Sequence, residues 1–312
     1  GYVGNKNDNL LNEGIANINA GPGGAMITDP DGNQDAYRPL SAYGDLSVYR
    51  HNVYTNYHAL QALLSRQRGN FNFTAAYTFS KVLGIRTSQN GNSWGSEYIV
   101  DPDEFYYGIQ GSDRTHVASL AFSWLLKEFK DNKTMDLFLG GWQIAGVASY
   151  VSGPPLQASY NANFNMGGTN ADGVEINGRN IVGSPNMTAF PVLTCDPSKD
   201  IPSGYMFDVS CFSAPSVGQN GNYIFPYIRG NAYKNLDMSL FKNFSIGSKG
   251  QKIQLRISGY NVLNRATWYP DTPSNLTLHY TNGVIDTPNF GKINEDNKFG
   301  RRIVQVALRF TF

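Results

Sequence analysis

The amino-acid sequence predicts an all-β fold in which an antiparallel, up-and-down sheet crosses a membrane as part of a β-barrel. Three observations lead to this prediction. Segments of about ten residues alternate between apolar and polar side chains, as strands with two different faces do. Gly and Asn cluster between these segments, in stretches such as "GQNGNY", and favour turns. Short and long connections alternate, which in an up-and-down sheet places all short turns at one end, as in transmembrane barrels.

Seven segments carry the alternation that predicts a strand. In residues 71–80, "FNFTAAYTFS", every odd position except Ala75 is aromatic, and every even position is Asn, Thr, Ala or Ser. The other segments repeat this pattern of one apolar and one polar face. The expected strands are residues 56–67, 71–80, 116–126, 141–151, 234–246, 251–260 and 301–312. An eighth, short strand is expected at residues 43–49.

The connections between these strands fall into two classes. Three are short, with the sequences "RQRGN", "KEFKDNKTMDLFLG" and "GSKGQ". Three are long and rich in Gly, Asn, Asp and Pro, namely residues 81–115, 152–233 and 263–301. We therefore expect residues 1–54 to form an extracellular loop with one short strand, and residues 55–312 to form barrel strands joined by long loops. A soluble β-sandwich is the alternative, although it gives no reason for long loops to share one side.

Composition argues against several classes of protein. The chain of 312 residues carries a net charge of +1 and has no run of Lys or Arg, so we expect no nucleic-acid partner. No stretch approaches eighteen uninterrupted apolar residues, and the first residues do not resemble a signal peptide. The four histidines, His51, His58, His116 and His279, are scattered without a metal-binding or triad-like spacing. We expect no enzyme activity.

The two cysteines indicate an oxidising compartment. Cys195 and Cys211 lie in the stretch "TCDPSKDIPSGYMFDVSCF", which reads as a loop. A disulfide that closes a loop of this length would contribute roughly 3 kcal/mol by the chain-entropy estimate. Two unpaired loop thiols are the alternative.

Side chains near the ends of the expected strands favour a lipid environment. Trp124, Trp142 and Tyr150 lie near the ends of apolar faces, where rings settle at a membrane interface. Lys234 and Lys242 fall on the apolar phase of one strand and enclose three apolar residues. Eight residues of a tilted strand cover roughly 19 Å of membrane depth. We expect both amines to extend to the two headgroup layers.

Seven blocks of the sequence, in order from about residue 40 to the end, resemble the C-terminal part of TonB-dependent outer-membrane receptors. The closest branch is the Oar-like receptors, which carry an N-terminal carboxypeptidase-regulatory-like domain. The blocks are "NYHALQALLSRQRGNFNFTAAYTFSK", "SDRTHVASLAFSW", "GGWQIAGVASYVSGPPL", "CFSAP", "IRGNAYKNLDMSLFKNFSI", "LRISGYNVLNRATW" and "FGKINEDNKFGRRIVQVALRFTF".

The resemblance implies a barrel of about 22 strands around a plug, energised by TonB through an N-terminal box. Seven or eight strands would make about a third of that wall, so we expect other strands to come from a longer polypeptide or another chain. A free-standing eight-stranded barrel is the alternative. The resemblance also implies that the last strand, with Val306, Leu308, Phe310 and Phe312 on one face, closes the barrel and is recognised by the barrel-assembly machinery.

Candidate ligand residues come from the loops and from the polar face. The alternating oxygen ligands Asp29, Asp31, Asn33 and Asp35 surround a Gly turn as in a small calcium loop, but without a distant bidentate Glu, and a solvated turn is the alternative. Rings in residues 94–107 could stack on a sugar or an apolar ligand. These rings are Trp94, Tyr98, Phe105, Tyr106 and Tyr107. The charged residues of the polar face, which could line a lumen, are Asp237, Arg256 and Arg309.

The sequence therefore predicts a transport or receptor protein of the bacterial outer membrane that takes up a bulky nutrient, with outer-membrane lipid, the TonB complex and the assembly machinery as partners. No cofactor is expected apart from the candidate calcium. Two alternatives remain, a structural or adhesive surface barrel without transport and a secreted, soluble β-sandwich binding module.

Overall fold

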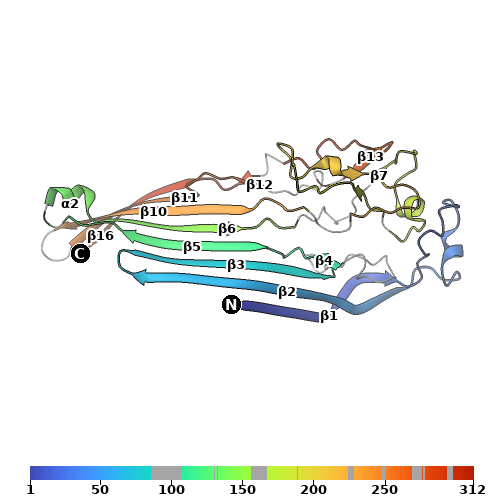
Figure 1. The fold of residues 1–312 in the computed structure, drawn as a ribbon, viewed down its shortest axis with the longest axis horizontal. Helices are drawn as coiled ribbons and strands as arrows, with labels where there is room; N and C mark the ends of the chain where they lie inside the picture. The colour runs from blue at the N-terminus through green and yellow to red at the C-terminus, as the bar shows by residue number, and fades with distance from the viewer. Residues whose placement is uncertain are drawn as a thin grey trace.

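Eight long strands form one antiparallel sheet in which each strand is hydrogen-bonded to the next along the chain (Figure 1). The computed structural model describes residues 1–85, 107–129, 131, 133–155, 167–187, 189–223, 228–246, 251–268, 276, 278–293 and 298–312. The strands are β1 (Tyr2–Asn17), β2 (Ser47–Arg68), β3 (Phe71–Ile85), β5 (His116–Leu125), β6 (Trp142–Val151), β10 (Tyr233–Ile246), β11 (Gln251–Tyr260) and β16 (Ile303–Thr311). A short strand, β4 (Tyr107–Ile109), pairs with the end of β3. The antiparallel up-and-down arrangement is as predicted.

The seven strands expected from alternation are all present, but the first part of the chain differs from the prediction. Residues 2–17 form a strand rather than a loop, and the short strand expected at 43–49 is the beginning of the continuous strand β2. β1 pairs with β2 from Tyr2 opposite Leu60 to Asn17 opposite Ser47. Its stretch "NKNDN" has no alternation, because backbone pairing with β2 and not an apolar face specifies this strand.

The register gives the sheet two different faces. We call the apolar face the even-numbered residues of β2, β5, β6, β10 and β16 together with the odd-numbered residues of β3 and β11. One row of this face runs from Ala75 through Leu120 and Ala148 to Leu236. The residues of opposite parity, here called the polar face, include rows of Ser, Thr, Asn and Gln. Because side chains alternate with period two, a slip of one residue in any pairing would mix the faces.

The long connections fold together at one end of the sheet into what we call the loop cap, the described parts of residues 18–46, 152–232 and 261–302 (Figure 1). Its hydrophobic core comprises Ile176, Ile181, Ala189, Met206, Phe207, Cys211, Phe212, Tyr223, Ile228, Leu276, Leu278, Tyr280 and Phe290. Its short elements are η1 (Gln34–Tyr37), β7 (Gly167–Gly168), η2 (Gly178–Val182), β8 (Val192–Leu193), η3 (Val209–Cys211), β9 (Phe212–Ser213), β12 (Thr267–Trp268), β13 (His279–Thr281), β14 (Val284–Ile285) and β15 (Lys298–Phe299).

The opposite end of the sheet carries short connections (Figure 1). A tight turn at Gly69, whose φ is 76°, joins β2 to β3, and the helix α2 (Lys133–Leu139) lies between β5 and β6. The chain ends there with Phe312, so short and long connections segregate as their lengths predicted. Among the described residues, no helix has the length and apolar character needed to span a bilayer.

Candidate membrane-spanning surface and loop cap

The apolar face of the sheet is open rather than covered by a second layer. Leu120, in the middle of β5, is 37% exposed, and Val306 of β16 is 66% exposed. The described long strands all belong to one sheet, whereas a sandwich packs two sheets face to face. An exposed apolar surface that extends over seven strands indicates contact with lipid.

Aromatic and cationic side chains form a belt at each end of this surface. Towards the loop cap, Tyr77 and His116 share a hydrogen bond of 2.7 Å between Oη and Nδ1, and the Lys234 amine lies 5.7 Å from the ring centroid of Tyr150. Towards the short turns, the rings of Phe71 and Trp124 meet edge to face at 6.4 Å. The two belts are about eight residues apart along a strand, roughly 19 Å of depth for a tilted strand.

A model of the family described as "Outer membrane beta barrel domain" matches residues 1–305. The chain belongs to this family. The belts, the open apolar face and the up-and-down sheet are therefore parts of an outer membrane β-barrel, and the protein is located in the bacterial outer membrane. Neither a curated protein nor a solved structure matches the chain.

One of the two lysines expected at the headgroup layers has a different role. Lys234 is exposed, but Lys242 is only 3% exposed. Its amine donates hydrogen bonds to the carbonyl of Asp136, at 3.2 Å, and to that of Gly140. The same amine lies 5.5 Å from the ring centroid of Trp142. Lys242 thus holds the C-terminal end of α2, so the expectation that it reaches the headgroups was wrong.

The polar face of this barrel wall is held by side-chain hydrogen bonds between neighbouring strands. Ser239 and Ser258 bond at 2.8 Å between their hydroxyl oxygens, and Gln143 donates to the Ser123 hydroxyl at 2.8 Å. The Gln254 amide donates to Asn243 Oδ1, also at 2.8 Å. Such pairs are compatible with a wall that borders water or a plug rather than hydrocarbon.

The three charged residues expected on this face all lie on it, but they are not gathered at one site. The Asp237 carboxylate accepts a hydrogen bond of 2.7 Å from the backbone N–H of Asn261, just beyond β11. Arg256 donates from Nε to the Ser258 hydroxyl at 2.8 Å, and its guanidinium lies 5.2 Å from the ring centroid of Phe241. Arg309 is exposed on β16.

The residues of the expected C-terminal signal lie as predicted on one face. Val306, Leu308 and Phe310 belong to the apolar face of β16, and Phe312 follows just beyond the strand. The rings of Phe310 and Phe312 are stacked with centroids 5.8 Å apart. Recognition by the assembly machinery stays a prediction.

The oxygen ligands of the candidate calcium loop have protein partners. The Asp29 carboxylate accepts from the Tyr37 hydroxyl at 2.9 Å, Asp35 accepts from Arg38 Nε at 2.7 Å, and the Asn33 side chain caps the η1 helix. The hydrogen bond to Asp29 raises the pKa of Tyr37. Among the described residues, the three carboxylates are not brought within ligand distance of one another. Of the rings expected to contact a ligand, Trp94, Tyr98, Phe105 and Tyr106 lie outside the described residues, and Tyr107 begins β4.

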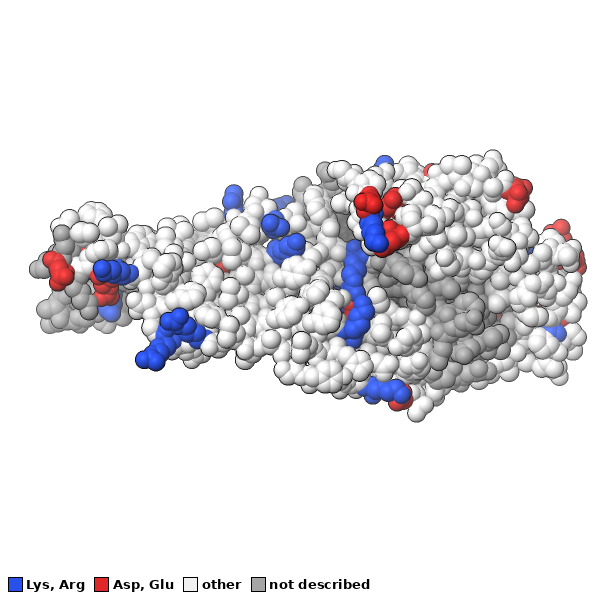
Figure 2. Space-filling view, in the orientation of Figure 1, with Lys and Arg blue, Asp and Glu red and all other residues white. Residues whose placement is uncertain are grey.

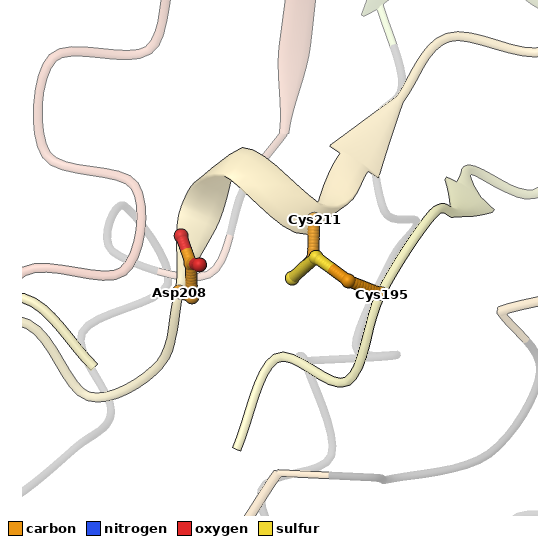
Figure 3. A group of neighbouring side chains, drawn as sticks. All are labelled: Cys195, Asp208 and Cys211. Carbon is orange, nitrogen blue, oxygen red and sulfur yellow. A yellow bond between two sulfur atoms is a disulfide. The ribbon is translucent and has the colours of Figure 1, made fainter. Parts of the chain in front are cut away.

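The disulfide between Cys195 and Cys211 is present, as predicted, and it lies in the loop cap (Figure 3). Its neighbour Asp208 begins η3 and accepts hydrogen bonds from the backbone N–H and the hydroxyl of Ser210, at 2.9 and 2.7 Å. Cys195, Asp208 and Cys211 form the one group of three metal-ligating side chains in the described part of the chain. Because both sulfurs are oxidised, this group is a structural element and not a metal site.

The sequence analysis missed a buried ion pair at the boundary between sheet and cap. Asp113 is fully buried and accepts from Arg229 Nη2 at 2.5 Å, from the Val82 N–H at 2.7 Å and from the Thr115 hydroxyl at 3.2 Å. Arg229 also donates to the Gly153 carbonyl at 3.3 Å. Burial lowers the pKa of the neighbouring Arg114. The signal was visible as "SDRTH" and "IRGN", but nothing local connects two residues so far apart in the chain.

A cavity of about 370 Å³ lies where β10 leaves the cap. Its lining comprises Asn231, Ala232, Lys234, Arg265, Ala266, Thr267 and Trp268. Within the described part of the chain, neither Lys234 nor Arg265 is paired with a carboxylate. Figure 2 shows that on the visible face acidic side chains gather at the two ends of the molecule, and the strand region between them is mostly uncharged.

Proposed function

We propose that this outer membrane barrel is the C-terminal part of a TonB-dependent receptor of the Oar-like branch, which takes up a bulky nutrient. The observation that carries the proposal is the polar face of the sheet. A barrel wall needs hydrogen-bonded hydroxyls, amides and charged groups only where it borders water or a plug. Further strands, supplied by the same polypeptide or another chain, would complete a barrel of about 22 strands. The seven blocks of resemblance support this branch.

In this proposal the long loops are extracellular and the short turns periplasmic, as is usual for barrels of the outer membrane. The step that moves the nutrient is a rearrangement of the plug powered by TonB, without covalent chemistry. The cavity near Lys234 and Arg265 is the candidate contact for a ligand that bears a negative charge, because two unpaired cations and the Trp268 ring line it.

A thiol-labelling experiment tests the transport proposal. Ser119 and Leu120 are exposed neighbours in the middle of β5, on the polar and the apolar face respectively. Both native cysteines are in the disulfide, so an introduced cysteine supplies the free thiol of this chain. We expect a membrane-impermeant maleimide to label Ser119→Cys in living cells, with a rate that falls when a protonophore removes the driving force. Leu120→Cys, the matched control, should react slowly under both conditions.

A structural or adhesive surface barrel is the second candidate, and the packed, disulfide-linked cap favours it. A cap of this kind presents a fixed surface to partners, whether or not the barrel transports a nutrient. Labelling of Ser119→Cys that does not respond to the protonophore would support this candidate over transport. The third alternative, the soluble sandwich, was wrong, because the described strands form a single layer with an open apolar face.

A further inference from the structure

The helix α2 lies against the apolar side of the sheet rather than the polar side. Two side chains of the apolar face hold it. Trp142 Nε1 donates to the Phe138 carbonyl at 2.8 Å, and the Lys242 amine donates to the carbonyls of Asp136 and Gly140. Because Trp142 and Lys242 both project from the face that contacts lipid, the helix sits on the lipid side of the barrel wall.

The helix turns apolar side chains outward. Phe138 is 67% exposed and Leu139 is 55% exposed, and Met135 and Leu137 are exposed as well. Met135, Phe138 and Leu139 are three and four residues apart, so they share one surface of the helix. A compact group of large apolar side chains left in water would be unfavourable, and such groups usually mark an interaction site.

We propose that α2 is a membrane-interface anchor whose apolar side chains enter the boundary between headgroups and acyl chains in the lipid leaflet at the short-turn end. Lipid is the partner because the surface of α2 continues the apolar face of β6 and β10 through Trp142 and Lys242. Interfacial helices bury their apolar surface by ~5–10 Å in this boundary. The anchor fixes the depth of the barrel wall, and it requires the membrane-spanning sheet but not transport.

Brominated lipids test the proposal. Phe138→Cys carries an environment-sensitive fluorophore, and the protein is reconstituted in phosphatidylcholine vesicles brominated either near the headgroup or near the chain end. The Phe138 carbonyl that accepts from Trp142 belongs to the backbone, so this substitution keeps the hydrogen bond. Asn70→Cys is the matched control, because Asn70 is exposed in the tight turn at the same end of the sheet. Leu139→Cys serves as a second position if Phe138→Cys does not fold.

We expect bromines near the headgroup to quench the probe at position 138 more strongly than bromines near the chain end, and neither to quench the probe at position 70. Quenching by aqueous iodide without quenching by bromolipid would show a helix in water and overturn the proposal. Protection from both quenchers would show that protein covers α2, and it would overturn the proposal as well. A heat-modifiable shift on gels identifies correctly folded variants.

Discussion

Arg229 Nη2 lies 2.5 Å from Asp113 Oδ2, and this ion pair joins the beginning of β10 to the beginning of β5 across 116 residues of sequence. The Asp113 side chain is fully buried, and it also accepts the backbone N–H of Val82 in β3. One carboxylate thus connects three strand ends beneath the loop cap. Removal of one partner of a buried pair leaves an uncompensated charge, which is a large cost.

We therefore predict that Asp113→Ala destabilises the rim of the sheet by about 3 kcal/mol. Hydrogen exchange of the Val82 amide should increase accordingly, because its acceptor is lost. Asp45→Ala is the comparison, since that carboxylate is largely exposed and pairs with Arg38 at 2.6 Å. Equal effects of the two substitutions on the Val82 amide would contradict the assigned role of Asp113.

The disulfide should stabilise the cap and not the sheet. Cys195 and Cys211 are 16 residues apart, and a closed loop of this size is worth roughly 3 kcal/mol in the chain-entropy estimate. In a Cys195→Ser, Cys211→Ser variant, we expect faster hydrogen exchange in β8 and β9, which flank the bridge. Exchange in β5 and β6 should be unchanged. Faster exchange throughout the strands would show that cap and sheet unfold together.

Lys242 and Lys234 form a matched pair for a test of the helix clamp. Lys242→Met removes charge-assisted hydrogen bonds to two carbonyls, each worth about 1.5–3 kcal/mol when made to a charged group. We expect α2 to exchange its amide hydrogens much faster in this variant. Lys234→Met, at the exposed end of the same strand, should leave α2 unchanged. Unaltered exchange in α2 after Lys242→Met would contradict the clamp.

Acid should loosen the β13–β14 hairpin in the cap. The Asp286 carboxylate accepts from the Thr281 hydroxyl at 2.5 Å and lies 2.6 Å from His279 Nδ1, and these contacts hold its pKa below the ordinary value. A lowered pKa means that the stabilisation is present above the ordinary Asp pKa of about 3.9 and is lost as the pH falls through the folded value.

Protection factors for hydrogen exchange in residues 279–285 should therefore decrease as the pH is lowered through this range. In Asp286→Asn the decrease should be much smaller, because the titrating group is gone. Asp196→Asn is the control, since that carboxylate also has a lowered pKa, through the Ser198 hydroxyl, but lies in another part of the cap. If Asp286→Asn retains the full acid response, another group is responsible.

The strands with one apolar face could be predicted from the sequence because lipid contact imposes a period of two on each of them separately. β1 could not, since its residues have no such face and its pairing depends on β2. The cap was missed for a related reason. The Ser184 hydroxyl donates to the Gly21 carbonyl at 2.7 Å, and Arg179 donates to the Pro30 carbonyl at 2.9 Å, across more than a hundred residues. Local patterns contain no information about such partners.

Lys242 shows the same limit within a predicted strand. Its position on the apolar phase was identified correctly, but a lysine at a strand end has two ways to satisfy its charge. It can reach the headgroups, or it can bind backbone carbonyls that a neighbouring connection supplies. The choice depends on α2 lying beside β10, which is a property of the folded connection between β5 and β6.

The most direct test measures the surroundings of the two faces in the middle of β5. Nitroxide labels at Leu120→Cys and Ser119→Cys, in the protein reconstituted in lipid, report collisions with molecular oxygen, which concentrates in hydrocarbon, and with a polar nickel chelate, which stays in water. We predict that the label at position 120 is more accessible to oxygen and the label at position 119 to the chelate. Low accessibility of position 120 to both reagents would place a second protein layer over the apolar face and contradict the account.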